Sequence, residues 1–177
     1  MGTENPFAKV KLFCGVIYRE NDRYEKTKEI LTTLFSPPDA ESGSIPFVLT
    51  DYYVSEMGIP LFRKFVSFCR LIAPEQLAEI KRITNRLERE TSINGKRTVN
   101  LDPGFLSAAN VIIATTKNHY HRIPLRDGIY AHLEYVIKNR QITFLEWTYP
   151  DFKTREYIDF FDQVRLLYKK NGAGTPD

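Results

Sequence analysis

The order of strand-like and helix-like segments in the first half of the chain is the strongest constraint on its fold. Apolar and β-branched runs predict strands, and apolar residues at a spacing of three and four predict helices. The expected elements are, in order, a strand at 9–18, a helix at 20–35, strands at 45–54 and 60–71, a helix at 74–87 and a strand at 97–101. Residues 36–44 have the composition of a loop, and Asn94-Gly95 predicts a turn. This βαββαβ order is the split βαβ arrangement of ferredoxin-like folds.

The second half of the chain is rich in predicted strands. Residues 121–125, 129–137 and 142–149 predict an antiparallel meander, in which His132 and Glu134 fall on the polar side of a half-buried strand and Trp147 and Tyr149 share one side of another. The apolar run 110–114 fits a strand or part of a helix. A last helix is expected from Thr154, with Gly172 at its C′ position and a disordered tail at 172–177. We therefore expect a single α+β domain over residues 1–177, with a ferredoxin-like first half, an added meander and a C-terminal helix.

Composition excludes several classes of protein. The 177 residues are 42% hydrophobic and carry a formal net charge of +3, which permits an anionic ligand without requiring one. The sequence contains no long apolar run of the kind that crosses a membrane and no secretory leader pattern, so we expect a cytoplasmic protein with no membrane partner. Cys14 and Cys69 lie in separate apolar runs and are expected to be buried free thiols.

One short segment predicts a polar site at the end of a strand. In Asn100-Leu101-Asp102 the two polar side chains point to the same face, where they could hold a cation or orient a ligand hydroxyl. The alternative is that Asp102 only hydrogen-bonds the turn that Pro103-Gly104 begins.

A second polar segment follows the apolar run 110–114. It supplies hydroxyl, ammonium, imidazole and guanidinium groups, which together are typical of phosphate sites, from Thr115, Thr116, Lys117, His119, His121 and Arg122. His119 and His121 would share a face if extended, and this also allows a metal pair with Asp102 or His132 as a third ligand. The alternative is a solvated hairpin end with ordinary polar residues.

Two further segments combine acidic and aromatic residues. Asp51, Tyr53 and Glu56 lie in one of them, although tyrosine pairs in strands more often serve packing. In the other, Trp147 precedes Asp151 and Thr154, either of which could simply cap the final helix. Phosphate-loop, dinucleotide-fingerprint, nucleophile-elbow and zinc-protease motifs are all absent from the sequence.

The stretches TDYYVSEMG, PLFRKFVSF, RTVNLDPGFLS, ATTK, DGIYAHL and WTYPDF, taken in order, give the chain a resemblance to a known family. The chain resembles an uncharacterised prokaryotic family of domains of unknown function, number 4416, over nearly its whole length. The resemblance implies motif positions at Asp51, Tyr52, Tyr53, Glu56, Met57, Gly58, Asn100, Asp102, Pro103, Gly104, Thr116, Lys117, His121, Arg122, Gly128, Tyr130, Trp147, Thr148, Tyr149, Pro150 and Asp151. Members are often labelled GTP-binding, and TTKNH is loosely similar to a Thr-Lys-x-Asp guanine motif in which His119 replaces the aspartate.

These observations together predict a protein that binds a phosphate-bearing ligand, either a nucleotide or a nucleic-acid end. Lys117, His121 and Arg122 would hold the phosphate, Asp102 and Asn100 would orient a hydroxyl or a divalent cation, and Tyr53 or Trp147 would stack a base. The remaining expected ligand contacts are Asp51, Glu56, Thr116, Tyr130 and Asp151. If the protein is an enzyme, we expect phosphoester hydrolysis or phosphoryl transfer, with His121 as general acid or base and Asp102 as the second catalytic residue.

Two other functions remain open from the sequence. An RNA-binding module could use the ferredoxin-like sheet, since Phe65-Val66-Ser67-Phe68 matches the end of a strand motif of RNA-recognition domains. A structural or interaction protein without a small ligand would instead present a large exposed apolar patch.

Overall fold

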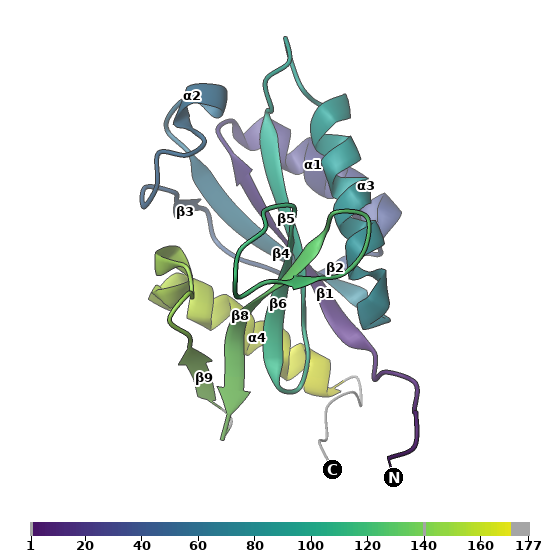
Figure 1. The fold of residues 1–177 in the computed structure, drawn as a ribbon. Helices are drawn as coiled ribbons and strands as arrows, with labels where there is room; N and C mark the ends of the chain where they lie inside the picture. Colours follow the sequence, from purple (N-terminus) through teal and green to yellow (C-terminus); the bar gives the residue numbers. More distant parts are fainter. Residues whose placement is uncertain (1, 140, 171–177) are drawn as a thin grey trace.

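The protein folds around one antiparallel sheet (Figure 1). The computed structural model describes residues 2–139 and 141–170. The strands in this part of the chain are β1 (Val10–Tyr18), β2 (Pro38–Glu41), β3 (Ile45–Pro46), β4 (Phe62–Ile72), β5 (Val99–Leu106), β6 (Asn110–Thr115), β7 (Ile123–Pro124), β8 (Tyr130–Lys138) and β9 (Gln141–Phe144). The helices are α1 (Asn21–Leu34), α2 (Val54–Met57), α3 (Leu77–Glu90) and α4 (Arg155–Lys170), with 3-10 turns η1 (Pro74–Gln76) and η2 (Pro150–Lys153). The α+β class expected from the sequence is confirmed.

The sheet has the strand order β2-β4-β1-β5-β6-β8-β7, with β3 also paired to β4 and β9 to β8. Each of these pairings is antiparallel. Among the described residues, no helix is both long enough and apolar enough to cross a membrane.

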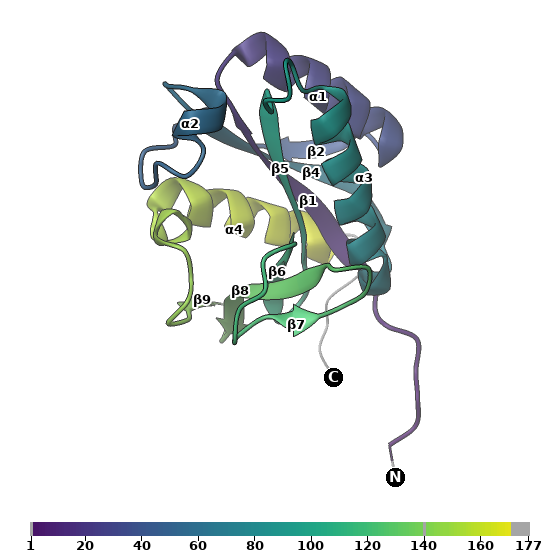
Figure 2. The same cartoon turned by 45° about the horizontal axis from the view of Figure 1, so that its top comes forward.

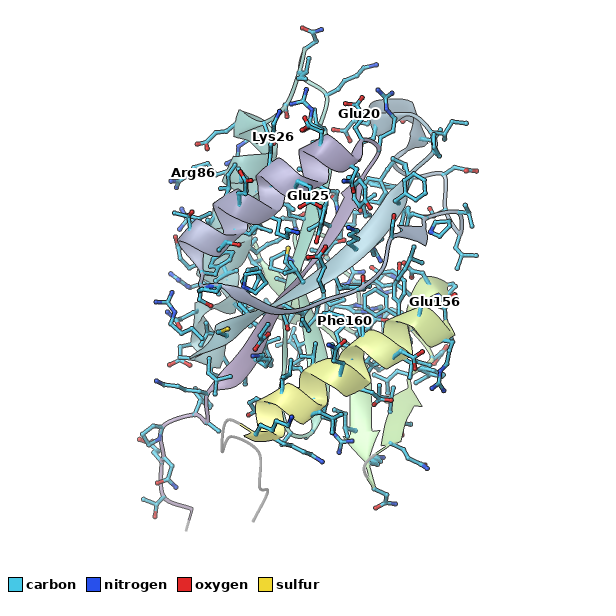
Figure 3. The ribbon with its side chains drawn as sticks, turned by 180° about the vertical axis from the view of Figure 1, so that it is seen from behind. Glu20, Glu25, Lys26, Arg86, Glu156 and Phe160 are labelled. Carbon is cyan, nitrogen blue, oxygen red and sulfur yellow. The ribbon has the colours of Figure 1, made fainter. Side chains whose placement is uncertain are left out.

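Helices cover both faces of the central strands. One apolar cluster joins alternate residues of β1 to α1 and α3, and a second joins the intervening Phe13 to α4. Figure 2 shows α1 and α3 on one side of β1 and β4, with α4 on the other. Phe160, labelled in Figure 3, belongs to the face of α4 that packs on the second cluster. Because both faces are covered, every residue of β1 is buried.

The segment between β2 and β4 differs from the expectation of a strand at 45–54. Only Ile45–Pro46 pairs with β4. Beyond them the backbone turns, because the Thr50 hydroxyl accepts a hydrogen bond from the Tyr52 amide and the short helix α2 follows. The expected loop at 36–44 was also wrong in part, since Pro38–Glu41 forms the edge strand β2, where proline is tolerated.

The second half of the chain and Cys69 require three corrections. His132 and Glu134 are 1% and 0% exposed rather than on a solvated side, and a bulge in β8 at Glu134, between Leu133 and Tyr135, breaks the expected alternation. Strand β9 ends at Phe144, so Trp147 and Tyr149 lie in the turn and coil before η2 and not on a strand. Of the two alternatives left open for the run 110–114, the structure shows the strand, β6. Cys69 is exposed at the end of β4, whereas Cys14 is buried as expected. The expected cap at Gly172 and the tail at 172–177 lie outside the described residues.

Strands β5 and β6 separate partway along their length, and the sequence of β5 explains why. Their pairing runs from Leu106↔Val111 to Gly104↔Ile113 and stops there. The preceding residue is Pro103, which has no amide hydrogen to donate to a neighbouring strand. Two residues earlier in β5, the backbone groups of Leu101 are hydrogen-bonded to α3 instead of to β6. The Lys81 side chain bonds the Leu101 carbonyl group, and the Glu88 side chain bonds its amide group. A space therefore opens between the two strands.

Replacing Gly104 by Ala should destabilise the fold at the last β5–β6 pair. An added methyl group would collide with the Ile112 carbonyl oxygen and the Phe13 ring, and the backbone oxygen cannot move aside cheaply. We expect a loss of about 1–3 kcal/mol in the free energy of unfolding, measured by urea denaturation. Gly43→Ala, where nothing lies within 4 Å of the new methyl group, should change stability little, and equal effects at the two positions would contradict the account.

Candidate functional site

The main cavity of the molecule lies where β5 and β6 separate. Its volume is about 490 Å³, within the range of pockets that hold small molecules. Its walls come from β5, α3, the end of β6, the segment between β3 and α2, and η2, together with Arg63 of β4 and His132 of β8. Distant parts of the sequence thus meet around one space.

A buried arginine fixes two of the predicted acidic residues at this cavity. Arg63 of β4 is 5% exposed, and its guanidinium group donates to Asp151 Oδ2 at 2.6 Å and to Asp102 Oδ2 at 3.1 Å. The Tyr157 hydroxyl lies 3.3 Å from the same guanidinium, and the Phe47 ring centre lies 4.6 Å from its carbon. The two carboxylates are therefore held by a charge within the protein rather than free for a ligand.

Helix α3 contributes two charged residues to the open edge of β5. Lys81 Nζ donates to the Leu101 carbonyl oxygen at 2.6 Å, and Glu88 Oε1 accepts from the Leu101 amide at 2.7 Å. Burial raises the pKa of Glu88 above its ordinary value. These side chains replace the strand partner that β5 lacks here.

Arg97 orients the amide of Asn100. Its Nη1 donates to Asn100 Oδ1 at 2.8 Å, while Nε and Nη2 bind the two carboxylate oxygens of Glu56 at 2.8 and 2.6 Å. These hydrogen bonds lower the pKa of Glu56. With Oδ1 engaged, the Asn100 Nδ2 donor is buried and has no hydrogen-bond partner among residues 2–139 and 141–170.

Lys117 and the tyrosines of the segment before α2 approach one another across the cavity. Lys117 Nζ lies 3.6 Å from the centre of the Tyr52 ring, which is a favourable cation–π distance. Both residues line the cavity, together with Tyr53 and Thr116. Lys117 is exposed, so its charge remains available to a ligand that enters from solvent.

Histidine and arginine side chains lie at and behind the cavity wall next to β8. His132 lines the cavity, and its Nδ1 accepts from Arg122 Nε at 3.2 Å. Arg122 also donates to the Tyr149 hydroxyl at 2.5 Å. His121 stacks on Trp147, with ring centres 4.9 Å apart and planes 7° from parallel. Desolvation and the neighbouring His132 lower the pKa of His121.

The structure brings some of the predicted site residues together and leaves others apart. The predicted residues that line the cavity are Tyr53, Asn100, Asp102, Thr116, Lys117 and Asp151. Four more of the predicted residues lie behind this lining. Glu56 bonds Arg97, and both His121 and Arg122 bond His132. Trp147 stacks on His121. Asp51 is exposed and Tyr130 is half-buried at the start of β8, and neither is among the lining residues.

Sequence reasoning missed Arg63, Lys81, Glu88, Arg97 and Glu134. A usable pattern existed for two of them, since Lys81 and Glu88 continue the inward helical spacing of Leu77 and Thr84. Arg63 stands in a strand with apolar neighbours, which also hints at a buried charge. No local pattern marks its two carboxylate partners.

The divalent cation considered from the sequence has no obvious set of ligands. Within the described part of the chain, no three or more histidine, cysteine, aspartate or glutamate side chains gather in a way that could hold a metal ion. His119 Nδ1 lies 2.9 Å from His121 Nδ1, so the pair is close, but a third ligand is missing from the described residues.

The fold and the cavity define an antiparallel α+β protein with a charged, partly open pocket at a split in its sheet. The family model described as Domain of unknown function (DUF4416) matches residues 8–168, so the chain belongs to that family and the resemblance seen in the sequence is confirmed. No curated protein and no solved structure matches the chain.

Proposed function

We propose that the protein binds a phosphate-bearing ligand, a nucleotide or a nucleic-acid end, in the cavity between β5 and β6. The observation that carries the proposal is that two residues of the cavity lining, Asn100 and Arg63, each have a buried hydrogen-bond donor, Nδ2 and Nε, without a partner among the described residues. A buried donor left unpaired costs about 1–3 kcal/mol, so a ligand rich in acceptor oxygens would relieve that cost.

The charge of the lining supports an anionic ligand. Five cationic side chains, Arg63, Lys81, Arg89, Arg97 and Lys117, line the cavity against three carboxylates, Glu88, Asp102 and Asp151. Positive potential in a partly enclosed space concentrates anions, because field lines are focused by low-dielectric walls. In this proposal Lys117 and Thr116 contact the phosphate and Tyr53 stacks on the base.

Four residues take roles other than those expected from the sequence alone. His121 and Arg122, which were expected to hold the phosphate, stand behind the cavity lining and contact His132. Asp102 serves mainly to hold Arg63 in place, since their side chains already form an ion pair. Trp147 supports His121 from behind and donates from Nε1 to the Leu133 carbonyl oxygen at 2.8 Å, so Tyr53 is the better base-stacking residue. Because members of the family are often labelled GTP-binding, guanine nucleotides are among the ligands to test.

The strand order of the first half supports a finer description of the fold. Strands β2, β4, β1 and β5 lie side by side in that order, with α1 and α3 on one face, which fits a ferredoxin-like unit whose second strand is β2. The RNA-binding alternative needs aromatic side chains exposed on such a sheet. Phe65 and Phe68 are 1% and 0% exposed, so the cavity is the better candidate for ligand binding.

Lys117→Met should weaken nucleotide binding by roughly tenfold, because a charge-assisted hydrogen bond contributes about 1.5–3 kcal/mol and Lys117 is partly screened by solvent. Isothermal titration calorimetry with guanosine and adenosine monophosphates would measure the affinity. Lys26→Met is the matched control, since Lys26 is an exposed lysine of α1 (Figure 3). The proposal is overturned if the unaltered protein binds neither nucleotide, or if both variants lose affinity equally.

A further inference from the structure

Two of the five cationic side chains in the cavity lining have no carboxylate partner in the described part of the chain. Arg63, Lys81 and Arg97 each form at least one ion pair with an aspartate or glutamate. Arg89 and Lys117 form none among residues 2–139 and 141–170, and both are exposed. The positive charge that an anionic ligand can neutralise is therefore carried by these two residues.

A series of contacts through two tyrosine rings leads from Lys117 to Arg97. Lys117 Nζ lies 3.6 Å from the Tyr52 ring centre, and the ring centres of Tyr52 and Tyr53 lie 4.9 Å apart. The guanidinium carbon of Arg97 lies 5.5 Å from the Tyr53 ring centre. Tyr53, the proposed base-stacking residue, thus stands between Lys117 and Arg97 in this series.

Helix α3 brings Arg89 to the Arg97 end of the series. Glu88, the residue before Arg89, has Oε2 3.5 Å from Arg97 Nη1, and its Oε1 accepts from the Leu101 amide at 2.7 Å. The Glu88 carboxylate is therefore engaged by other groups, while the next side chain, Arg89, belongs to the cavity lining. Arg89 and Lys117 approach the cavity from two different walls, with Tyr53 between them in the series of contacts.

A neutral hydrogen-bonding side chain accompanies each of these two cations. Thr116 precedes Lys117, Asn85 lies one helical turn before Arg89 on α3, and all four line the cavity. The Asn85 side-chain amide makes no hydrogen bond within the described part of the chain. Hydroxyl and amide donors beside a cation suit phosphate oxygens, and the arginine fork matches the geometry of a phosphate group. Each wall thus carries the groups of one phosphate subsite.

We propose that the cavity has two phosphate subsites and that its ligand is the 5′-phosphorylated end of a single-stranded nucleic acid. This inference rests on the proposed function, and it chooses between the nucleotide and the nucleic-acid end named there. The terminal 5′ phosphate lies at Lys117 and Thr116, the base stacks on Tyr53, and the 3′ phosphodiester lies at Arg89 and Asn85. Because Arg89 is exposed, the rest of the strand leaves the cavity at that side.

The first test compares three adenosine ligands by isothermal titration calorimetry. Adenosine 3′,5′-bisphosphate should bind the parent protein about fivefold to tenfold more tightly than adenosine 5′-monophosphate, because it fills both subsites and the second is partly screened by solvent. Adenosine diphosphate, whose phosphates are adjacent, should gain less. Equal affinity for the monophosphate and the bisphosphate, or an equal gain with the diphosphate, would overturn the inference.

Two arginine variants locate the second subsite. Arg89→Met should remove the gain, so that the variant binds the bisphosphate no more tightly than the monophosphate. Arg86→Met is the matched control, since Arg86 is an exposed arginine of the same helix outside the cavity lining (Figure 3), and it should keep the gain. If both variants lose the gain equally, or neither does, the second subsite fails while the proposed function stands. If none of the three ligands binds the parent protein, the proposed function itself fails.

The second test uses short strands in competition with a fluorescent bisphosphate. Tetraadenylate with a 5′ phosphate should displace the probe, and the same strand with a 5′ hydroxyl should be about tenfold weaker because the Lys117 subsite stays empty. The ribose and deoxyribose forms are measured separately, since the 2′ hydroxyl distinguishes RNA from DNA. If the bisphosphate binds and neither phosphorylated strand displaces it, the chain has no way out of the cavity and the assignment to a nucleic-acid end is overturned.

Discussion

Arg63→Met should cost about 3–5 kcal/mol in the free energy of unfolding, the largest effect that we expect from a single substitution in the site. The guanidinium of Arg63 is the shared partner of Asp102 and Asp151, and all three side chains are mostly buried. Without the arginine, the two carboxylates would lose their shared partner in a poorly solvated region, where Lys81 Nζ, 3.9 Å from Asp102 Oδ1, would remain as the nearby positive charge. Chemical denaturation monitored by circular dichroism would measure the loss.

A triple variant provides the matched control. Adding Asp102→Asn and Asp151→Asn to Arg63→Met removes the uncompensated charges and should recover a large part of the lost stability. If Arg63→Met alone costs less than about 1 kcal/mol, the ion-pair cluster does not organise this region of the fold.

Asn100→Leu should reduce nucleotide affinity by about tenfold to a hundredfold, which makes it the largest functional effect that we expect. The substitution keeps the approximate shape of the side chain and removes the unpaired Nδ2 donor, and a hydrogen bond to a charged phosphate contributes about 1.5–3 kcal/mol. Calorimetry would measure the affinity, and denaturation would verify that the variant is folded. Asn118→Leu, at an exposed position next to Lys117 and outside the cavity lining, should bind nucleotide like the parent protein. Equal affinity of Asn100→Leu and the parent would show that Nδ2 makes no ligand contact.

The main elements of the fold were predictable because their hydrophobic patterns are local. The strand β1 and the helices α1, α3 and α4 appear where alternation or helical spacing predicts them. Strand β5 overlaps the expected strand at 97–101 only in part. It continues through Pro103-Gly104 to Leu106, where a turn was expected, because Pro103 and Gly104 pair with β1. The segment at 45–54 was wrong because its aromatic and β-branched residues favour a strand, while contacts with distant residues decide otherwise. Phe47 and Met57 instead pack around Ile17 and Leu61. Propensity in such a stretch is a weak guide, since tertiary packing overrides it.

The candidate site was partly predictable for the same reason. Asn100 and Asp102 share a face in any extended strand, and the end of β6 naturally presents Lys117. The partners of Arg63 could not be anticipated, because Asp102 lies 39 residues away and Asp151 lies 88 residues away along the chain. The burial of Glu134 also depends on a bulge and on hydrogen bonds from Tyr149 and Thr148, which no single-strand pattern contains.

The most direct test of the central claim is an amide NMR titration of the labelled protein with guanosine and adenosine monophosphates. If the cavity between β5 and β6 holds a phosphate-bearing ligand, the signals of Tyr53, Asn100 and Lys117 should shift first and saturate together. Signals on the exposed side of α1, such as that of Lys26, should stay in place. The account would be contradicted by a spectrum that does not change with either nucleotide, or by shifts that map to a surface away from this cavity.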